Sequence, residues 1–221
     1  MIRLAKILTA GTALLTVVAA PCFAEDLIRD GISDGALIVN GQLNLAPVFS
    51  ELNAVIVEVE GDASAASTAV GNQVTVITNT NTVVHNNQYM GGDVGSSLSA
   101  KVNGVGGDVS LTATSMCNGA SVSTDPVLTK VNSTQTCGGN DPWANVYANV
   151  QNVGGAVGIN AHAVGNQIEI DSDARKFPVN NWQENHAGTF ANVNANVKNV
   201  GAVGVSATAV GNTAQILHLG H

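Results

Sequence analysis

The sequence contains little charge and few aromatic residues. Of its 221 residues, 11% are charged and 4% are aromatic, and 16 acidic residues outnumber 8 lysines and arginines. The shortage of positive charge argues against nucleic acid or anionic lipid as a partner, because both require a cationic surface. With 45% hydrophobic residues, the chain also differs from disordered proteins, which combine low hydrophobicity with high net charge. We therefore expect an ordered fold with a core of small residues, stabilised by close backbone approach and long hydrogen-bond ladders.

The sequence also lacks the motifs of catalysis and cofactor binding. It has no Gly-x-Ser-x-Gly elbow, no His-Glu-x-x-His helix and no phosphate-binding glycine loop. The acidic pair in Asp171–Asp173 is interpreted as a solvated turn, and His218 and His221 lack a third metal ligand nearby. No catalytic residue, cofactor or metal site is predicted, and we expect the chain not to be an enzyme.

Residues 1–24 have the pattern of a secretory signal peptide. Arg3 and Lys6 precede an apolar run over Ile7–Ala20, and small residues end the segment at Ala24. The apolar run is shorter than the roughly 20 residues that span a bilayer, so a membrane anchor is the weaker interpretation. Cleavage would leave 6 basic and 16 acidic residues, and no transmembrane span is expected in the mature chain.

Two cysteines, Cys117 and Cys137, remain after that cleavage. An even pair of cysteines in an exported protein favours a disulfide over two free buried thiols. A loop of this length stabilises the fold by about 3 kcal/mol in the chain-entropy model.

A repeated stretch dominates the remainder of the chain. GAVGVSATAVGNTAQI at Gly201–Ile216 has a near-copy at Gly155–Ile170, a third version at Asp62–Val76 and a degenerate fourth at Gly107–Val122. The asparagines within these copies are separated by 46, 48 and 46 residues. A fixed period indicates one supersecondary unit that was multiplied.

Each copy alternates small apolar and polar residues, the pattern of a strand with one buried face. In Gly155–Ile170 the inward row is predicted to be Val157, Ile159, Ala161 and Ala163. Glycine and asparagine tolerate positive φ, so those between the runs are interpreted as turns. The predicted structural turn residues are Gly71, Asn72, Asn118, Gly165, Asn166, Gly211 and Asn212.

These patterns predict an all-β fold, a β-solenoid or stacked β-sheet array. It would have four repeats of about 47 residues, each with about three short strands. Residues 25–52 are expected to form an N-terminal β cap with a hairpin at Asn40-Gly41. The β-repeat domain would span 53–221, and its repeat cores are predicted at about 53–76, 98–122, 144–170 and 191–217.

The segments between the cores contain most of the aromatic residues. In repeat arrays such insertions often emerge on one face and bind ligands, although their aromatic side chains can equally pack against the stack. The candidate binding residues are Tyr89, Trp143, Phe177, Trp182 and Phe190.

The Ala-Val-Gly-Asn turns at 69–72, 163–166 and 209–212 resemble those of bacterial holdfast-attachment proteins. The strand–Gly-Asn–strand plan is similar to curlin-like functional amyloids and other surface adhesins, but the regular Gln/Asn ladders of curlin are expected to be mostly missing. The resemblance covers the repeats, about half of the mature chain.

This resemblance implies a secreted bacterial cell-surface protein, located at the outer-membrane surface of the cell envelope. Its role would be structural or adhesive, in surface attachment or in holdfast or biofilm matrix anchoring, with self-assembly as an option. Implied partners are the chain itself or related surface subunits, a cell-surface polysaccharide or an outer-membrane partner. A periplasmic or extracellular carbohydrate-binding module is the alternative, and a β-helical enzyme comes third.

Overall fold

The computed structural model describes residues 8–9, 35–125, 128–139 and 141–219, and the regular elements in these ranges are β-strands. The predicted signal segment lies outside the described residues except for strand β1, and so do residues 25–34 of the predicted cap. The strands are β1 (Leu8–Thr9), β2 (Ala36–Asn44), β3 (Val48–Val59), β4 (Ala63–Thr78), β5 (Thr82–Met90), β6 (Val94–Val105), β7 (Val109–Thr124), β8 (Thr129–Cys137), β9 (Trp143–Ser172), β10 (Val179–Asn185) and β11 (Phe190–His218). The all-β prediction is confirmed.

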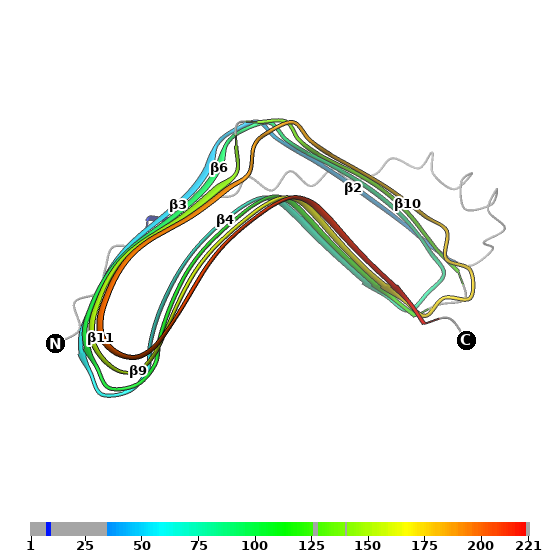
Figure 1. Ribbon diagram of the computed structural model, residues 1–221. Helices are drawn as coiled ribbons and strands as arrows, with labels where there is room; N and C mark the ends of the chain where they lie inside the picture. Colours follow the sequence, from blue (N-terminus) through cyan, green and yellow to red (C-terminus); the bar gives the residue numbers. More distant parts are fainter. Residues whose placement is uncertain (1–7, 10–34, 126–127, 140, 220–221) are drawn as a thin grey trace.

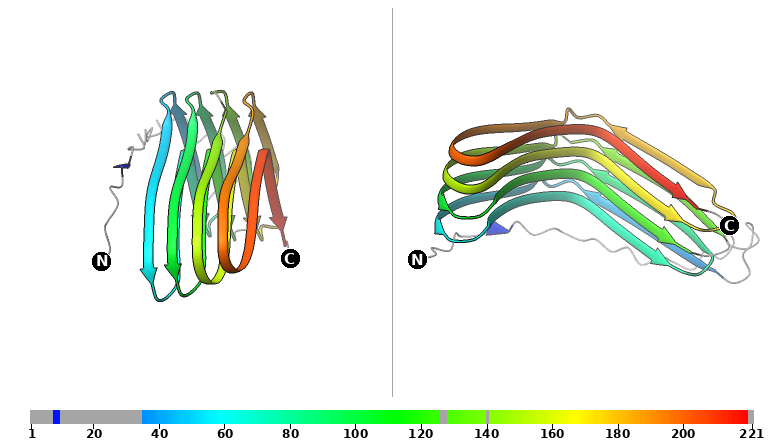
Figure 2. Two further views of the ribbon diagram at one scale, coloured as in Figure 1. Left: turned by 60° about the vertical axis from the view of Figure 1, so that its left-hand side comes forward. Right: turned by 60° about the horizontal axis from the view of Figure 1, so that its bottom comes forward.

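Strands one repeat apart in the sequence lie side by side in parallel register. One sheet has the order β10-β8-β5-β2. In the other sheet β3 pairs with β6 and β4 with β7, β6 and β7 both pair with β9, and β9 pairs with β11. Paired residues are 46 to 48 positions apart throughout these parallel pairs. The strands of successive passes are visible side by side in Figure 2.

The chain forms two layers that meet along their apolar faces (Figure 1). The first layer consists of the β10-β8-β5-β2 sheet together with β3, β6 and the N-terminal halves of β9 and β11. The second layer consists of β4, β7 and the C-terminal halves of β9 and β11. Each pass runs along the first layer, reverses at one edge and returns along the second layer (Figure 1).

Small apolar side chains fill the space between the layers. The inward row predicted in the third repeat is buried, with Val157, Ile159, Ala161 and Ala163 each at most 1% exposed. The same core contains leucines from β6 and β7 and alanines from each pass of the chain. A second core lies between the four-stranded sheet and the C-terminal ends of the second-layer strands. The expectation of an alanine- and valine-rich interior is therefore correct.

Two of the predicted local features have a different structure. The chain does not form a hairpin at Asn40-Gly41, because β2 continues through both residues as the outermost strand of the four-stranded sheet. The segments treated as inserts contain β5, β8 and β10, which form the rest of that sheet. Parallel pairing with the neighbouring pass satisfies their backbone groups, so these segments belong to the stack.

The predicted turns at the repeated Gly-Asn pairs are also replaced by strands. Gly71 and Asn72 lie within β4, Asn118 within β7, Gly165 and Asn166 within β9, and Gly211 and Asn212 within β11. The positive-φ residues in the described ranges are Glu58, Gly104, Asn152 and Asn199. They share one register position at the end of the first layer, so the positive-φ backbone lies there and not at the Gly-Asn pairs.

Close packing explains the glycine of the first Gly-Asn pair. A Cβ atom at Gly71 would lie 2.6 Å from the carbonyl oxygen of Cys117 and 2.6 Å from the sulfur of Met90. Glycine is therefore required for close approach to the neighbouring chain, and not for a left-handed conformation.

Candidate functional site

The four repeated asparagines form a ladder along the stack, which we call the asparagine ladder (Asn72, Asn118, Asn166 and Asn212). The Nδ2 of each donates to the Oδ1 of the next, at 2.8, 2.7 and 2.8 Å. The second Nδ2 hydrogen of Asn72, Asn118 and Asn166 donates across to the first layer, to the backbone oxygens of Tyr89, Thr136 and Glu184. The ladder therefore joins neighbouring passes and also joins the two layers. Buried amides satisfied in this way hold the chain extended where the sequence suggested a turn.

A second ladder also runs along the stack, but its side chains donate in the opposite direction, from each later pass to the one before. This glutamine ladder consists of Gln42, Gln88, Gln135 and Gln183. The Nε2 of each later residue donates to the Oε1 of the one before, at 2.7, 2.8 and 2.8 Å. Each Nε2 also donates to a second-layer backbone oxygen, at Gln73, Gly119, Gln167 or Thr213.

The expectation that regular Gln/Asn ladders are mostly missing is therefore wrong. The glutamines lie in the segments that the sequence pattern assigns to a cap and inserts. Their spacing of 46, 47 and 48 residues matches the repeat period, and this was the signal that could have revealed them. The ladders are polar networks whose satisfied members fix the register of the stack.

The predicted disulfide between Cys117 and Cys137 is present. Cys117 lies in second-layer strand β7 and Cys137 ends first-layer strand β8, and both are fully buried. The bond therefore fastens the two layers together beside the asparagine ladder, and it fits an extracytoplasmic location.

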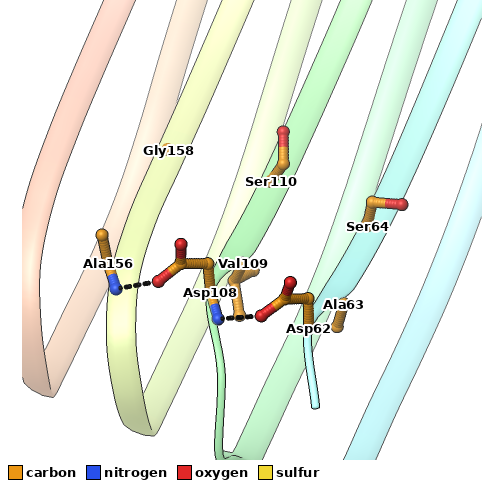
Figure 3. Close-up of a pocket in the computed structure, with 8 residues that line it drawn as sticks. All are labelled: Asp62, Ala63, Ser64, Asp108, Val109, Ser110, Ala156 and Gly158. Carbon is orange, nitrogen blue, oxygen red and sulfur yellow. Dashed lines mark hydrogen bonds between the residues drawn. The ribbon is translucent and has the colours of Figure 1, made fainter.

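A pocket of about 400 Å³ lies at the edge of the second layer. Figure 3 shows Asp62 and Asp108 side by side in it, on neighbouring passes. Asp62 Oδ1 accepts from the backbone nitrogen of Asp108, and Asp108 Oδ1 accepts from that of Ala156, both at 2.8 Å. The carboxylates thus cap the backbone of the next pass, which gives the pair a structural role.

The predicted aromatic residues lie at several places in the first layer and its connections. Trp182 and Phe190 are exposed by 63% and 56%, whereas Trp143 is half-buried against the exposed Phe49, with ring centroids 6.2 Å apart. Phe177 packs near His218, at 5.1 Å between ring centroids. Tyr89 is exposed on β5 and lies close to Gly138. These side chains do not form one cluster.

Sequence reasoning missed two exposed aromatic residues, Phe49 in β3 and Tyr147 in β9. Tyr147 is the one that lines a groove, an open one of about 540 Å³ on the outer face of the first layer. The polar side chains of the groove come from all four neighbouring first-layer strands: Asn53, Ser99, Lys101, Asn149 and Asn194. Tyr147 was detectable as an outward residue in the alternating pattern of the third repeat.

The C-terminal end of the stack is uncovered. Val203 and Val205 of β11 are 50% and 55% exposed, although their register partners Val157 and Ile159 in β9 are at most 1% exposed. The layers are offset, since Asn72, Asn118 and Asn166 each donate to the first-layer strand of the following pass. No pass follows β11 in the described chain, and Asn212 Nδ2 makes only a 3.4 Å contact back to the oxygen of Gln183.

Among the described residues, no group of three or more His, Cys, Asp or Glu side chains is arranged to hold a metal ion. No helix in the described part of the chain has the length and apolar character needed to cross a membrane.

Comparison with known proteins gives a family assignment. No curated protein and no solved structure matches the chain. The model of the family described as HfaD, holdfast attachment protein D, matches residues 50–221, which include β4 to β11, both amide ladders beyond Gln42 and the groove around Tyr147. Since this match covers most of the sequence, the chain belongs to the holdfast attachment protein D family.

Proposed function

We propose that this chain is a β-solenoid of four passes, each of about 47 residues, which serves as a structural element of surface attachment rather than as an enzyme. Family membership implies a holdfast attachment role at the bacterial surface. The parallel register at 46 to 48 residues and the two amide ladders support the solenoid description. A rigid, disulfide-fastened stack is suited to transmitting load between an adhesive and the cell.

The chain assembles head-to-tail with further copies of itself, and the uncovered end of β11 is the observation that carries this proposal. The apolar inward row of β11, including Val203, Val205 and Ile216, is 49–55% exposed. Exposed apolar rows on an open sheet edge are templates for pairing with another chain.

The two ends of the stack are complementary in their hydrogen bonding. At the C-terminal end, Asn212 Nδ2 can donate and Gln183 Oε1 can accept. At the N-terminal end, Asn72 Oδ1 can accept and Gln42 Nε2 can donate, because the ladders of the described residues begin at these atoms. A second copy placed one repeat further along continues both ladders. Its Leu43 then occupies the register position of Tyr89, Thr136 and Glu184, whose backbone oxygens accept from the asparagine ladder.

A charge on the uncovered row tests this assembly. Val205→Lys places an ammonium group between the docked copies, where it would be desolvated without a partner. Ser206→Lys is the matched control, because Ser206 is exposed on the same strand but belongs to the outward row. Light scattering of the purified proteins should show large assemblies for the wild type and for Ser206→Lys, and monomers for Val205→Lys.

Fibre diffraction of the assembled protein should give a meridional reflection near 4.7–4.8 Å, the strand spacing. A wild type that stays monomeric at all concentrations would refute the assembly. The attachment role has a separate test, which is a surface-attachment assay on cells lacking the gene. Unimpaired attachment of those cells would refute the role, and restored attachment by Ser206→Lys but not by Val205→Lys would link assembly to it.

A further inference from the structure

We infer that the groove around Tyr147 binds an extended, uncharged glycan chain, so that the outer face of the first layer is a polysaccharide-binding surface. This inference rests on the proposed attachment role, and it adds the site and the chemical class of the ligand. The groove has a volume of about 540 Å³, within the range of roughly 300–1,000 Å³ that is usual for ligand sites.

The groove places an aromatic ring among planar amides. Tyr147 is 45% exposed, and its register partners on the neighbouring strands are Ser99 and Asn194. Asn53 continues the same row, and Asn149 and Lys101 form the row beside it. Neighbouring strands are about 4.8 Å apart, so the ring has hydrogen-bonding side chains on both of its flanks.

This combination suits a sugar ring better than other ligands. A pyranose presents apolar C–H groups on its face and hydroxyls around its rim, and amphipathic aromatic rings combine with a few polar groups in the same way. The residues lining the groove include no carboxylate, and Lys101 is their one charged side chain. A polycation would find no carboxylate among these lining residues, and a polyanion would be repelled by the acidic chain, whose formal net charge is −8.

The surface extends beyond the groove along the strands. Four residues before Tyr147 lies Trp143, with Phe49 and Phe190 in the same register row. Gly95 occupies the fourth position of this row, and the indole of Trp143 lies over it. Four residues of strand span about 13 Å. A ligand that follows the strands can therefore rest on Tyr147 and on this second aromatic row, which indicates a chain of several sugars and not a monosaccharide.

The outward face of the second layer is also exposed to solvent, but it lacks the aromatic side chains of the first layer. In the described strands every aromatic residue belongs to the first layer. The outward rows of β4 and β7 contain small, hydroxyl-bearing, amide and aliphatic side chains and the thioether of Met116. The aromatic rows and the groove occur together on one face only.

Isothermal titration calorimetry of the purified wild type with three hexasaccharides tests the inference. The neutral probes are cellohexaose and chitohexaose, and hexagalacturonate is the anionic probe. We expect at least one neutral hexasaccharide to bind, with hexagalacturonate at least 10-fold weaker. Tyr147→Ala should weaken the neutral probe at least 10-fold and Asn149→Ala about threefold. Trp182→Ala, an aromatic residue exposed elsewhere on the first layer, should change affinity less than twofold.

The inference is overturned if neither neutral probe binds, if hexagalacturonate binds best, or if Tyr147→Ala and Trp182→Ala have equal effects. Circular dichroism establishes that each variant is folded. Tyr147→Ala should assemble as the wild type does, since Tyr147 lies on the outward face of the first layer and does not belong to the uncovered inward row of β11. Loss of glycan binding with intact assembly therefore separates a failure of this inference from a failure of the proposed assembly.

Discussion

The two layers are built on the same repeat but differ in what they display. The second-layer strands contain no aromatic residue, and their only charged residues in the described chain are Glu169 and Asp171 in β9. The first-layer strands contain six aromatic residues and six charged ones, and their outer face bears the groove around Tyr147. The asparagine ladder belongs to the second layer. The glutamine ladder belongs to the first layer, so both layers maintain the stack. The first layer alone also bears the groove that we propose as a recognition surface.

The largest loss of stability is expected when a charge is introduced into the asparagine ladder of the second layer. Asn118 Nδ2 donates to the Oδ1 of Asn166 and to the backbone oxygen of Thr136. Asn118→Asp replaces this donor with an oxygen that faces two other oxygens in a fully buried position. We expect a loss of about 3–5 kcal/mol in the free energy of unfolding.

Urea denaturation measures this loss. The control is Asn149→Asp on the exposed first-layer face, where a change within about 0.5 kcal/mol is expected. Equal losses for both variants would show that the ladder has no special structural role.

The next largest difference in the free energy of unfolding is expected between two core truncations at the same register position. Ile159 is fully buried in β9, and its partner Val205 in β11 is 55% exposed. Ile159→Ala should cost about 3 kcal/mol, because it removes buried methyl groups and leaves a cavity. Val205→Ala should cost less than about 1 kcal/mol in dilute, monomeric protein. If the stability loss of Val205→Ala rises with protein concentration, this end of the stack is covered on assembly.

Removal of the disulfide tests the fastening of one layer to the other. Replacement of both cysteines, Cys117→Ala with Cys137→Ala, should lower the free energy of unfolding by roughly 2–3 kcal/mol, since the bond closes a loop with a sequence separation of 20. Thermal unfolding of the double variant measures this, with dithiothreitol-treated wild type as the reference. Identical melting of the oxidised and reduced wild type would contradict the prediction.

The smallest effect is expected from a pair of glycines, one in each layer. A Cβ atom at Gly95 would overlap the indole ring of Trp143, whereas at Gly158 its nearest contact is the oxygen of Val109 at 3.9 Å. Gly95→Ala should shift the tryptophan emission maximum and cost about 1 kcal/mol, because the ring must move. Gly158→Ala should change neither quantity measurably. Unchanged emission in Gly95→Ala would mean that Trp143 does not rest on Gly95.

Local patterns predicted the interior better than the path of the chain. The alternation in 155–170 identifies Val157, Ile159, Ala161 and Ala163 as inward, because side chains of a strand alternate between two faces wherever that strand lies. The Gly-Asn pairs were interpreted as turns, because both residues favour turns when considered singly. The hydrogen bonds that keep Asn118 in a strand come from Asn72 and go to Asn166 and Thr136, and no local window contains those partners.

The candidate site was less predictable than the core. Cys117 and Cys137 could be paired by counting, since two cysteines allow one bond. Tyr147 and its register partners Ser99 and Asn194 are separated by about one repeat each in the sequence, so their grouping depends on the register between passes. The predicted binding aromatics lie in segments that the sequence pattern assigns to inserts, but these segments contain the strands β5, β8 and β10 of a sheet in the stack.

The repeat period, the alternation of inward and outward residues, the small-residue core and the cysteine pair can all be predicted from the amino-acid sequence. Each of these follows from spacing within the chain, which a one-dimensional pattern contains. Tertiary structure alone decided that the Gly-Asn pairs are extended, that two amide ladders join the layers, that Tyr147 lies among asparagines, and that β11 leaves an uncovered end. These features arise from parallel pairing between residues 46 to 48 positions apart and from the offset between layers, and both are set only when the passes are stacked.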